Sequence, residues 1–406
     1  MNPTEALLVP QPGARVASSV DLSERPVRVL QLAYGHALYG AERWVLTLIK
    51  HLDPRRVETI VAGIRDADTP SLPLIDEAQR LGFETTILEA TTRVLRSSIR
   101  GLRAVLRSRR IDVVHSHGVR QNVVAFLASR GYPVKLLSTP HGWETRCSLK
   151  ERARTLLDKA VFRGFDAVAP LSEELRDSMR TFRLPKARVR LIRNGVDLSE
   201  VESAVPIEGL LPGQSNGKEL VIGYVGQLIP RKGLAVLLEA LSRLPFADWT
   251  CLVIGEGPDR VNLERMATRL GLEPRVSFLG YRPERLRYLK RLDFLVLPSF
   301  REGIPRCLLE ALAAGIPCAG SSIPGIDAVL RGGLAGDTFS SGDARKLADI
   351  IAWHQRDPER GRRQAATGQA FVYEAFSARA MARSYERLYQ ILVRQVPSAG
   401  GMNGVA

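Results

Sequence analysis

The chain has 406 residues, of which 45% are hydrophobic and 25% are charged, a balance typical of a soluble globular protein of about two domains. No apolar run reaches the roughly 18 residues of a membrane span, so we expect none. The net charge of +15 predicts an anionic partner such as nucleic acid, anionic lipid or a phosphorylated substrate. Nucleic acid fits poorly, because no zinc-finger spacing, recognition-helix pattern or aromatic sheet signature accompanies the basic residues.

The N-terminal segment, residues 1–25, is predicted to be a disordered tail. It lacks the basic start and the apolar core of a secretion signal, so we expect the protein to stay in the cytoplasm. The four cysteines lack the spacing of metal ligands, and we expect reduced thiols with neither a disulfide nor a metal. They are Cys147, Cys251, Cys307 and Cys318.

Apolar strands alternate with helical segments through residues 26–197, the first predicted domain. The first strand, VRVLQLAY, ends at Gly35 and precedes a helix predicted from Ala41 to Lys50. The further predicted strands are VETIVAGI, FETTILEA, IDVVHSHG, VKLLSTPHG, FDAVAPLS and VRLIRNGVD. Such alternation implies a doubly wound α/β domain whose parallel sheet is covered on both faces.

A second domain follows a predicted linker. Residues 198–218 are rich in Glu, Pro, Gly and Ser, and strands alternate with helices again in residues 219–375, from ELVIGYVG through WTCLVIG, RVSFLGY and DFLVLPS to GIPCAGS. A last helical segment, residues 376–396, is expected to pack back on the first domain. Ligands of such sheets bind beyond the carboxyl ends of the strands, so two facing domains predict a site in the cleft.

The stretch SFREGIPRCLLEALAAG (299–315) carries two glutamates across a loop-to-helix transition. Pro305 fits an early helical position, and residues 308–314 are strong helix formers. This spacing predicts Glu302 at the mouth of the helix and Glu310 about two turns further in, where both can face a ligand at the helix N-terminus. The alternative is a charged loop that caps an alanine-rich helix.

The stretch GYVGQLIPRKG (223–233) opens the second domain as a strand, a glycine turn and a helix start. Backbone amides at this turn, together with Arg231 and Lys232, suit a diphosphate. The alternative is a plain strand-turn-helix with solvated basic residues. A dinucleotide oxidoreductase is disfavoured, because neither this turn nor VIGEGPDR has the spacing Gly-x-Gly-x-x-Gly.

Both stretches, with VIGEGPDR and RVSFLGYR between them, resemble the donor-binding elements of glycosyltransferase family 4, the group 1 glycosyl transferases. The resemblance implies the GT-B fold, in which two Rossmann-like domains face each other across a cleft. It also implies a retaining, metal-independent enzyme (EC 2.4) without a cofactor, which uses a nucleoside-diphosphate sugar. The residues it implies for the donor are Gly226, Arg231, Lys232, Gly255, Glu302, Gly303, Ile304, Pro305 and Glu310.

The resemblance assigns roles to some of these residues. Glu310 would bind the ribose hydroxyls of the donor, and Glu302 would approach the sugar. Lys232 matches a family lysine that contacts the donor phosphates, and we expect Lys232 and Glu302 to act in catalysis. Gln227 stands where the family usually has an arginine, and Arg231 is the expected substitute.

In the first domain the resemblance implies a phosphate or acceptor loop and a catalytic histidine. Gly40 and Glu42 belong to YGAE, which is similar to the family loop Gly-Gly-x-Glu, although Glu42 also fits a first-turn helix charge. His117 matches a family histidine near the transferred sugar, and His141 of TPHG is expected as a second contact. The alternative for each histidine is a structural role. A metal held by His115, His117 and His141 is disfavoured, because no carboxylate or cysteine accompanies them at ligand spacing.

Two further patterns each leave an alternative open. Asp66-Ala67-Asp68 resembles the metal-binding Asp-x-Asp of the other major glycosyltransferase fold, but it lies in a polar loop of a different architecture. A series of arginines at helical spacing predicts either the solvated face of a sheet-covering helix or a surface for anionic lipid at the inner face of the membrane. These arginines are Arg93, Arg96, Arg100, Arg103, Arg107 and Arg110.

The resemblance therefore predicts transfer of a sugar to a hydroxyl of a glycan or lipid-linked acceptor, in the synthesis of cell-envelope polysaccharide, exopolysaccharide or lipopolysaccharide. Two alternatives stay open. One is a nucleotide-sugar epimerase of similar fold. The other is a catalytically silent partner subunit, which is favoured slightly by three departures from the family pattern. Gln227 replaces an arginine, Tyr39 replaces the first glycine of Gly-Gly-x-Glu, and Pro324 takes one glycine position of the family's Gly-Gly-x-x-Glu.

Overall fold

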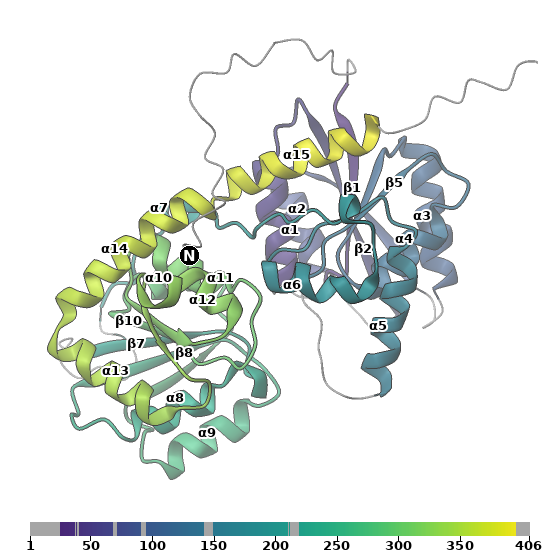
Figure 1. Cartoon of the computed structure of the whole chain (residues 1–406). Coiled ribbons are helices and arrows are strands. Elements are labelled where there is room, and N and C mark those ends of the chain that lie inside the picture. The colour runs from purple at the N-terminus through teal and green to yellow at the C-terminus, as the bar shows by residue number, and fades with distance from the viewer. Residues whose placement is uncertain are drawn as a thin grey trace, which may run out of the picture.

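The computed structural model describes residues 25–36, 38, 40–67, 71–90, 95–141, 149–209, 211 and 219–394. Two α/β domains lie side by side, each built around one six-stranded sheet. The long helix α15 (Ala378–Arg394), yellow in Figure 1, follows the second domain in the chain and lies along the first. The predicted architecture of two Rossmann-like, doubly wound domains is therefore confirmed.

The strands of the first sheet pair in parallel in the order β3-β2-β1-β4-β5-β6. Their bounds are β1 (Val27–Ala33), β2 (Val57–Asp66), β3 (Glu84–Ala90), β4 (Val113–Ser116), β5 (Lys135–Ser138) and β6 (Ala167–Val168). Within β1, Val29 belongs to one buried cluster, whereas Leu30 and Leu32 belong to another. Because successive side chains of a strand point to opposite faces, the sheet is buried on both sides.

Helices cover both faces of this sheet (Figure 1). The face of Val29 is covered by α1 (Gly40–His51), α2 (Pro73–Arg80) and α15, and the face of Leu30 by α3 (Arg96–Arg109), α4 (Val119–Ala128) and α5 (Leu149–Phe162). The short helix α6 (Glu173–Ser178) follows β6. Buried side chains of these helices, most of them aliphatic, produce this packing.

The second sheet repeats the same topology. Its strand order is β12-β11-β10-β7-β8-β9, which equals that of the first sheet when β7 is counted as its first strand. The bounds are β7 (Leu220–Val225), β8 (Trp249–Ile254), β9 (Val276–Gly280), β10 (Phe294–Leu297), β11 (Cys318–Ser321) and β12 (Asp337–Phe339). In both domains the order reverses between the first and the fourth strand, which is where open α/β sheets bind ligands.

The helices of the second domain also divide between two faces. One buried cluster includes α8 (Leu234–Leu241), α9 (Arg260–Arg269) and α13 (Ala344–Arg356), and the other includes α10 (Arg285–Leu289), α11 (Arg306–Ala313), α12 (Pro324–Leu330) and α14 (Pro358–Ala375). After α14 an isolated parallel bridge joins Ser377 to Val196. Beyond it, α15 buries Tyr385 and Tyr389 against the first sheet.

Three elements differ from the sequence prediction. The stretch 189–197 is not a strand, because β6 is only two residues long and offers Val189 a single bridge. The strand β12 was missed, since its three residues carry no apolar run. The first six residues of the predicted linker form helix α7 (Leu198–Ser203), which Asp197 caps by accepting a hydrogen bond from the Glu200 amide.

The predicted arginine stripe on α3 is partly engaged with protein. Arg103 Nη2 donates to the Leu127 carbonyl at 3.1 Å, and Arg107 Nε donates to Tyr132 Oη at 2.8 Å. The cause is that α3 packs beside α4, so that one edge of the stripe faces that helix and the loop after it. Arg103 and Arg107 are therefore partly held by protein atoms, and the choice between a solvated face and a lipid surface stays a prediction.

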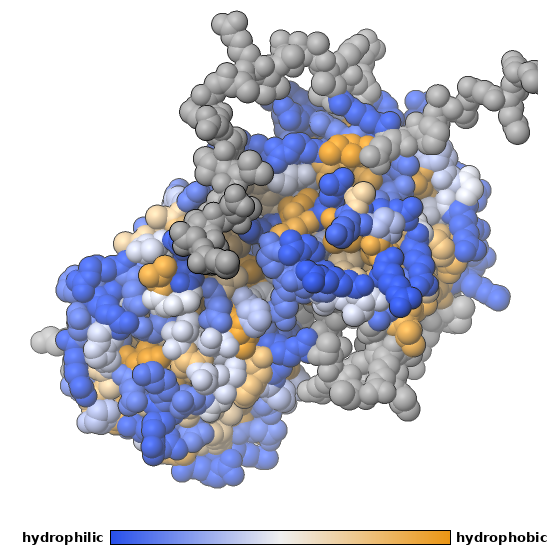
Figure 2. Space-filling model, in the orientation of Figure 1, coloured by the Kyte–Doolittle hydropathy of each residue, from blue (hydrophilic) through white to orange (hydrophobic). Residues whose placement is uncertain are grey.

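The rest of the stripe divides further. Arg110 follows the end of α3 in a left-handed conformation with φ of 47°, and Arg93 lies outside the described residues. Arg96 and Arg100 are exposed. Hydrophilic side chains cover most of the face seen in Figure 2, over both domains. None of the described helices has both the length and the hydropathy needed to cross a bilayer.

Candidate active site

A cavity of about 370 Å³ lies between the two domains at the carboxyl ends of their strands. The first domain contributes the start of α1, with Gly40 and Arg43, and His141 after β5. The second domain contributes the loops after β7, β8 and β10 and the first turns of α11. This is the position that the reversal of strand order favours in each sheet.

Glycines bring the loops after β7 and β8 into close backbone contact. Gly255 has φ of 145°, and a Cβ there would lie 1.9 Å from the carbonyl oxygen of Gly226. The Gly226 amide also donates to the Ile254 carbonyl at 3.0 Å. A side chain at position 255 would force the two loops apart. This part of the cavity therefore presents backbone, which a phosphate group can approach closely.

Lys232 and Glu302 form an ion pair inside the cavity. Lys232 Nζ contacts Glu302 Oε1, and Ser299 Oγ donates to the same oxygen at 2.9 Å. Gly233, with φ of 67°, allows this contact, because a Cβ there would lie 2.0 Å from the Pro298 carbonyl oxygen. The loop after β7 thus rests on the loop after β10. Two of the residues predicted to act in catalysis therefore neutralise each other in this structure.

Glu310 lies in α11 between two arginines. Arg285 Nε donates to Glu310 Oε2 at 3.1 Å, and Arg285 Nη2 contacts the other carboxylate oxygen. Arg306 Nη2 lies 3.6 Å from that second oxygen. Burial acts to raise the pKa of Glu310, but the charges of Arg285 and Arg306 outweigh it and hold the pKa below its ordinary value. The carboxylate is therefore ionised and faces two guanidinium groups.

The two arginines keep unused donors. Arg285 Nη1 and Arg306 Nε are buried, and neither has a hydrogen-bond partner among the described residues. Burial lowers the pKa of Arg306. Buried donors of this kind normally have a partner, so both nitrogens are available to an anionic or hydroxyl group of a ligand.

Several hydrogen bonds between described residues join the domains around the cavity. Arg43 Nη2 donates to Tyr281 Oη at 2.7 Å, and Arg306 Nη1 donates to Thr47 Oγ1 at 3.0 Å. Asn194 Nδ2 donates to a carbonyl of the loop after β10 at 3.2 Å. Tyr281 Oη also donates to the Leu38 carbonyl at 3.4 Å. Arg43 and Thr47 both belong to α1, so this helix of the first domain forms one wall of the cavity.

Three histidines gather at the carboxyl ends of β4 and β5. His115 lies in β4 and is fully buried, whereas His117 follows the strand with its Nε2 2.9 Å from Gln31 Oε1. His141 lines the cavity, and its Nε2 lies 3.3 Å from His117 Nδ1. Burial lowers the pKa of His141 to about 3 and the pKa of the other two well below the ordinary value. All three rings are therefore neutral at pH 7.

Every predicted donor-binding residue lines the cavity, as do Gly40 and His141. Their roles in binding stay predictions. Glu42 and His117 are not among the described residues that line it, which differs from our expectation. Glu42 belongs to the first turn of α1, as the alternative interpretation had it. The ring of His117 is held by Gln31 within the first domain, so His141 is the histidine that the cavity reaches.

Sequence reasoning missed Arg43 and Arg285 as cavity residues, and it considered only the backbone at Arg306. One signal could have found them. Arg285 and Arg306 are the first residues of α10 and α11, and Arg43 lies in the first turn of α1. A helix N-terminus carries partial positive charge and disfavours a cation, so an arginine at this position is stabilised by an anionic partner or ligand.

The predicted Asp66-x-Asp68 motif is engaged by protein at its first residue. Arg120 donates to both oxygens of Asp66 at 2.7 and 2.8 Å, and Tyr34 Oη also donates to it at 3.1 Å. The hydrogen bond from Arg120 is the main cause of a lowered pKa of Asp66. Asp68 lies outside the described residues. No group of ligands suited to a metal ion occurs in the part of the chain that the structure describes.

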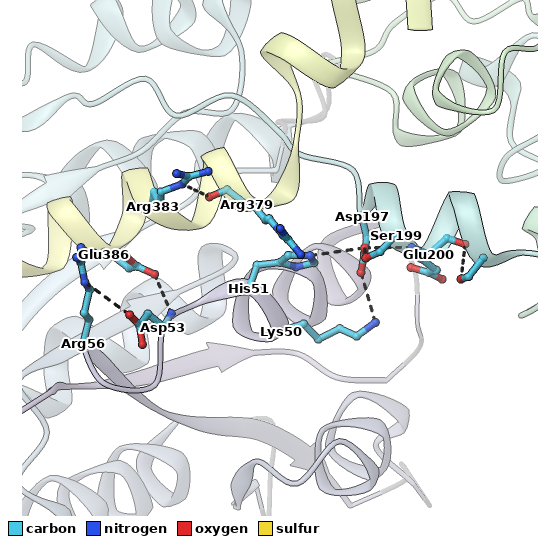
Figure 3. A pocket seen from close by; sticks show the side chains of 11 residues that line it. Lys50, His51, Asp53, Arg56, Asp197, Ser199, Glu200, Arg379, Arg383 and Glu386 are labelled. Carbon is cyan, nitrogen blue, oxygen red and sulfur yellow. Dashed lines mark hydrogen bonds and ion pairs between the residues drawn. The ribbon is translucent and has the colours of Figure 1, made fainter. Parts of the chain in front are cut away.

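A larger cavity of about 960 Å³ lies between the end of α1, the start of α7 and α15 (Figure 3). Its walls are charged side chains that pair with each other. Asp197 lies 3.6 Å from Lys50 and 3.5 Å from His51, and Glu386 lies 3.7 Å from Arg56. These pairs join three segments where the chain passes between the domains, so we interpret this cavity as a structural junction.

Two family models match the chain. The model described as Glycosyltransferase Family 4 matches residues 39–200, and the model described as Glycosyl transferases group 1 matches residues 212–371. The chain is a group 1 / family 4 glycosyltransferase. The group 1 match contains all the predicted donor-binding residues, and the family 4 match contains the three clustered histidines.

Relatives of known name are similar over most of the chain. D-inositol 3-phosphate glycosyltransferase of Nocardia farcinica is 27% identical over 92% of this chain and 86% of its own length. N-acetyl-alpha-D-glucosaminyl L-malate synthase of Bacillus anthracis is 25% identical over 70% of this chain and 76% of its own.

Solved structures share the fold. HepE of Anabaena in complex with UDP and glucose matches with a TM-score of 0.78 at 19% identity, over 90% of this chain and 100% of that one. Sucrose-phosphate synthase from Thermosynechococcus elongatus matches with a TM-score of 0.78 at 20% identity, over 91% and 100%. The two facing Rossmann-like domains are therefore the GT-B fold.

Proposed function

We propose that this glycosyltransferase moves a hexosyl group from a nucleoside-diphosphate sugar to a hydroxyl of a glycan or lipid-linked acceptor, with retention of configuration and without a metal. The donor occupies the cavity between the domains, and the acceptor approaches from the first domain. Relatives support a role in the cell envelope. They include the O-antigen biosynthesis glycosyltransferase WclY of Escherichia coli, 25% identical, and UDP-Gal:alpha-D-GlcNAc-diphosphoundecaprenol alpha-1,3-galactosyltransferase, also of Escherichia coli and 25% identical.

The observation that carries the proposal is the excess of cations around the cavity. Six basic side chains line it against three acidic ones, an excess of three positive charges when neutral His141 is left out. The basic residues are Arg43, Arg231, Lys232, Arg282, Arg285 and Arg306, and the acidic ones are Glu256, Glu302 and Glu310. Such an excess favours a ligand of opposite charge, such as a nucleoside diphosphate. HepE of Anabaena, which has this fold, has been solved with UDP and with UDP-glucose.

The same cations supply a mechanism. When the donor enters, its diphosphate takes Lys232 from Glu302, and Glu302 turns to the sugar hydroxyls. As the bond to the sugar breaks, Arg231 and Lys232 stabilise the charge that grows on the diphosphate, which is the task of a metal ion in other enzymes. The departing phosphate accepts the proton of the acceptor hydroxyl on the same face, so the configuration is retained. His141 takes the place near the sugar that the sequence suggested for His117.

A lipid-linked acceptor would place the protein at a membrane surface. We propose that Arg96 and Arg100, both exposed on α3, face anionic headgroups there. Each basic residue near such a surface contributes about 1 kcal/mol. Arg103 and Arg107 contribute less, because both donate to protein atoms.

One assay tests the proposal against both alternatives. The purified protein is incubated with a panel of UDP-sugars and GDP-sugars, with and without an acceptor glycan, and both nucleoside diphosphate and sugar products are followed by mass spectrometry. We expect acceptor-dependent release of the diphosphate together with a glycan enlarged by one sugar. A converted sugar without transfer would identify an epimerase. No diphosphate release from any donor would identify a silent subunit.

A further inference from the structure

The histidine cluster continues into a buried hydrogen-bond chain that ends on the C-terminal helix. The links are His141 Nε2 to His117 Nδ1 at 3.3 Å, His117 Nε2 to Gln31 Oε1 at 2.9 Å, Gln31 Nε2 to Tyr389 Oη at 3.0 Å, and Tyr389 Oη to His115 Nδ1 at 2.8 Å. Gln31, Tyr389 and His115 are fully buried. His141 lines the cavity, so the chain connects the proposed active site with α15.

Gln31 determines which group donates and which accepts in each hydrogen bond of this chain, because an amide side chain has one donating and one accepting end. Its Nε2 donates to Tyr389 Oη, so its Oε1 accepts from His117. A neutral His117 must then carry its proton on Nε2, which leaves a lone pair on Nδ1. That lone pair accepts a hydrogen bond from His141, whose single proton therefore lies on Nε2.

We infer that Gln31 and Tyr389 are positioning residues, which hold His141 in the Nε2–H tautomer and so offer its Nδ1 lone pair to a hydroxyl group in the cavity. Nε2 is the ring nitrogen turned to His117. Nδ1 makes no hydrogen bond to the described residues and is the nitrogen left for the cavity. The inference rests on the proposed function only for the identity of that hydroxyl, which would belong to the sugar or the acceptor.

The indole ring of Trp44 lies near all three histidines of this hydrogen-bond chain. The Trp44 ring centroid lies 6.1 Å from that of His115, 5.4 Å from that of His117 and 5.1 Å from that of His141. Burial keeps the rings neutral by lowering their pKa values. In a low-dielectric interior each hydrogen bond polarises the next, so the tautomers are set together.

Helix α15, which carries Tyr389, also carries the residue for a matched control, Tyr385. His115 Nε2 lies 2.8 Å from Thr139 Oγ1, which in turn lies 2.8 Å from Tyr385 Oη. Tyr385 is fully buried on α15, like Tyr389, and both make hydrogen bonds through their hydroxyl groups. Along the chain of hydrogen bonds, however, Tyr385 follows His115 and Thr139 and makes none of the links between Gln31, His117 and His141. Loss of its hydroxyl should cost similar stability without touching the link to the cavity.

Nitrogen NMR of the full chain with labelled histidine tests the inference, because protonated and unprotonated ring nitrogens resonate far apart. The chain has six histidines, and single His-to-Asn variants assign the signals. We expect the protons of His117 and His141 on Nε2 in the wild type. We expect Tyr389→Phe to shift both toward a mixture of tautomers, since the amide of Gln31 is then free to reverse. Tyr385→Phe should leave both unchanged.

Gln31→Met removes the amide that links His117 to Tyr389, so it should shift the tautomers of His117 and His141 in the same way as Tyr389→Phe. Unchanged tautomers in both variants would overturn the inference. So would a wild-type His141 that carries its proton on Nδ1, which corresponds to the reversed amide of Gln31.

Kinetics measure what the lone pair does in transfer. Using UDP-glucose as the first donor, we expect Tyr389→Phe to lower kcat about three- to tenfold, the size of one neutral hydrogen bond, with unchanged donor KM. Tyr385→Phe should leave both constants unchanged. An unchanged kcat despite shifted tautomers would refute the role in transfer. The NMR result needs no substrate, so a failed transfer assay would count against the proposed function and not against the tautomer.

Discussion

Removal of the charge of Glu310 should destabilise the second domain strongly. Glu310 is 2% exposed and Arg285 is 8% exposed, so Glu310→Gln leaves two guanidinium groups in a buried site without their counter-charge. Loss of one partner of a buried ion pair costs about 3 to 5 kcal/mol, because the remaining charge stays desolvated. An exposed ion pair contributes only about 0 to 1 kcal/mol. We therefore expect a loss of about 3 kcal/mol or more in the free energy of unfolding.

Urea unfolding followed by tryptophan fluorescence measures this loss, since Trp249 and Trp353 report on the second domain. Glu264→Gln is the matched control. Its carboxylate lies 2.8 Å from Arg260, with side chains 42% and 32% exposed, and we expect less than about 1 kcal/mol. Equal midpoints for Glu310→Gln and Glu264→Gln would refute the reasoning.

The pH dependence gives an independent check. The pKa of Glu310 is lowered in the folded state, so its stabilisation is fully present above the unfolded pKa of about 4.3 and is lost as the pH falls through the folded value. The difference between wild type and Glu310→Gln should therefore be largest at neutral pH and shrink in acid. A difference that grows in acid would contradict the assigned ion pair.

The remaining predictions concern catalysis, metal, membrane and the domain junction. Lys232→Ala should lower kcat on the order of a hundredfold, the usual loss for a preorganised charge-stabilising group, and activity within a few-fold of wild type would move the phosphate contact elsewhere. EDTA should leave transfer intact, and activity lost with chelator and restored by manganese would refute the metal-independent mechanism. Double reversal of Arg96 and Arg100 to glutamate should reduce sedimentation with anionic vesicles, and unchanged sedimentation would return α3 to a solvated face. Asp197→Asn keeps a capping side chain on α7 but loses the charge beside His51. The hydrogen bond to Asp197 raises the pKa of His51. Burial acts to raise the pKa of Asp197, but its hydrogen bonds, the one from His51 among them, outweigh burial and lower that pKa. The stabilisation from Asp197 is therefore lost in acid, and the stabilisation from His51 is lost at high pH. The Tm of the wild type should exceed that of Asp197→Asn most between about pH 4 and pH 6.5. A constant difference in Tm from about pH 3 to pH 9 would contradict the ion pair.

Much of the fold follows from local pattern. The apolar run of β1 and the helix formers of α11 depend on neighbours in the sequence, so the alternation that predicts two doubly wound domains is visible without the structure. Each predicted donor loop is one continuous stretch of sequence, and Gly226, Lys232 and Glu302 of these loops all line the cavity. The prediction of a strand at 189–197 was wrong, because this apolar run has only the two-residue strand β6 beside it to pair with.

The partners of the site residues came from packing between distant segments. Arg285 meets Glu310 25 residues away, and Arg43 meets Tyr281 238 residues away. Tyr389, from the far end of the chain, links His115 to Gln31. Sequence pattern placed Arg43 and Tyr389 on predicted helices and His115 at the end of a predicted strand, because hydrophobic periodicity is a property of short segments. It could not say which atom each one faces, because an ion pair or a buried hydrogen bond forms only where separately encoded segments pack together.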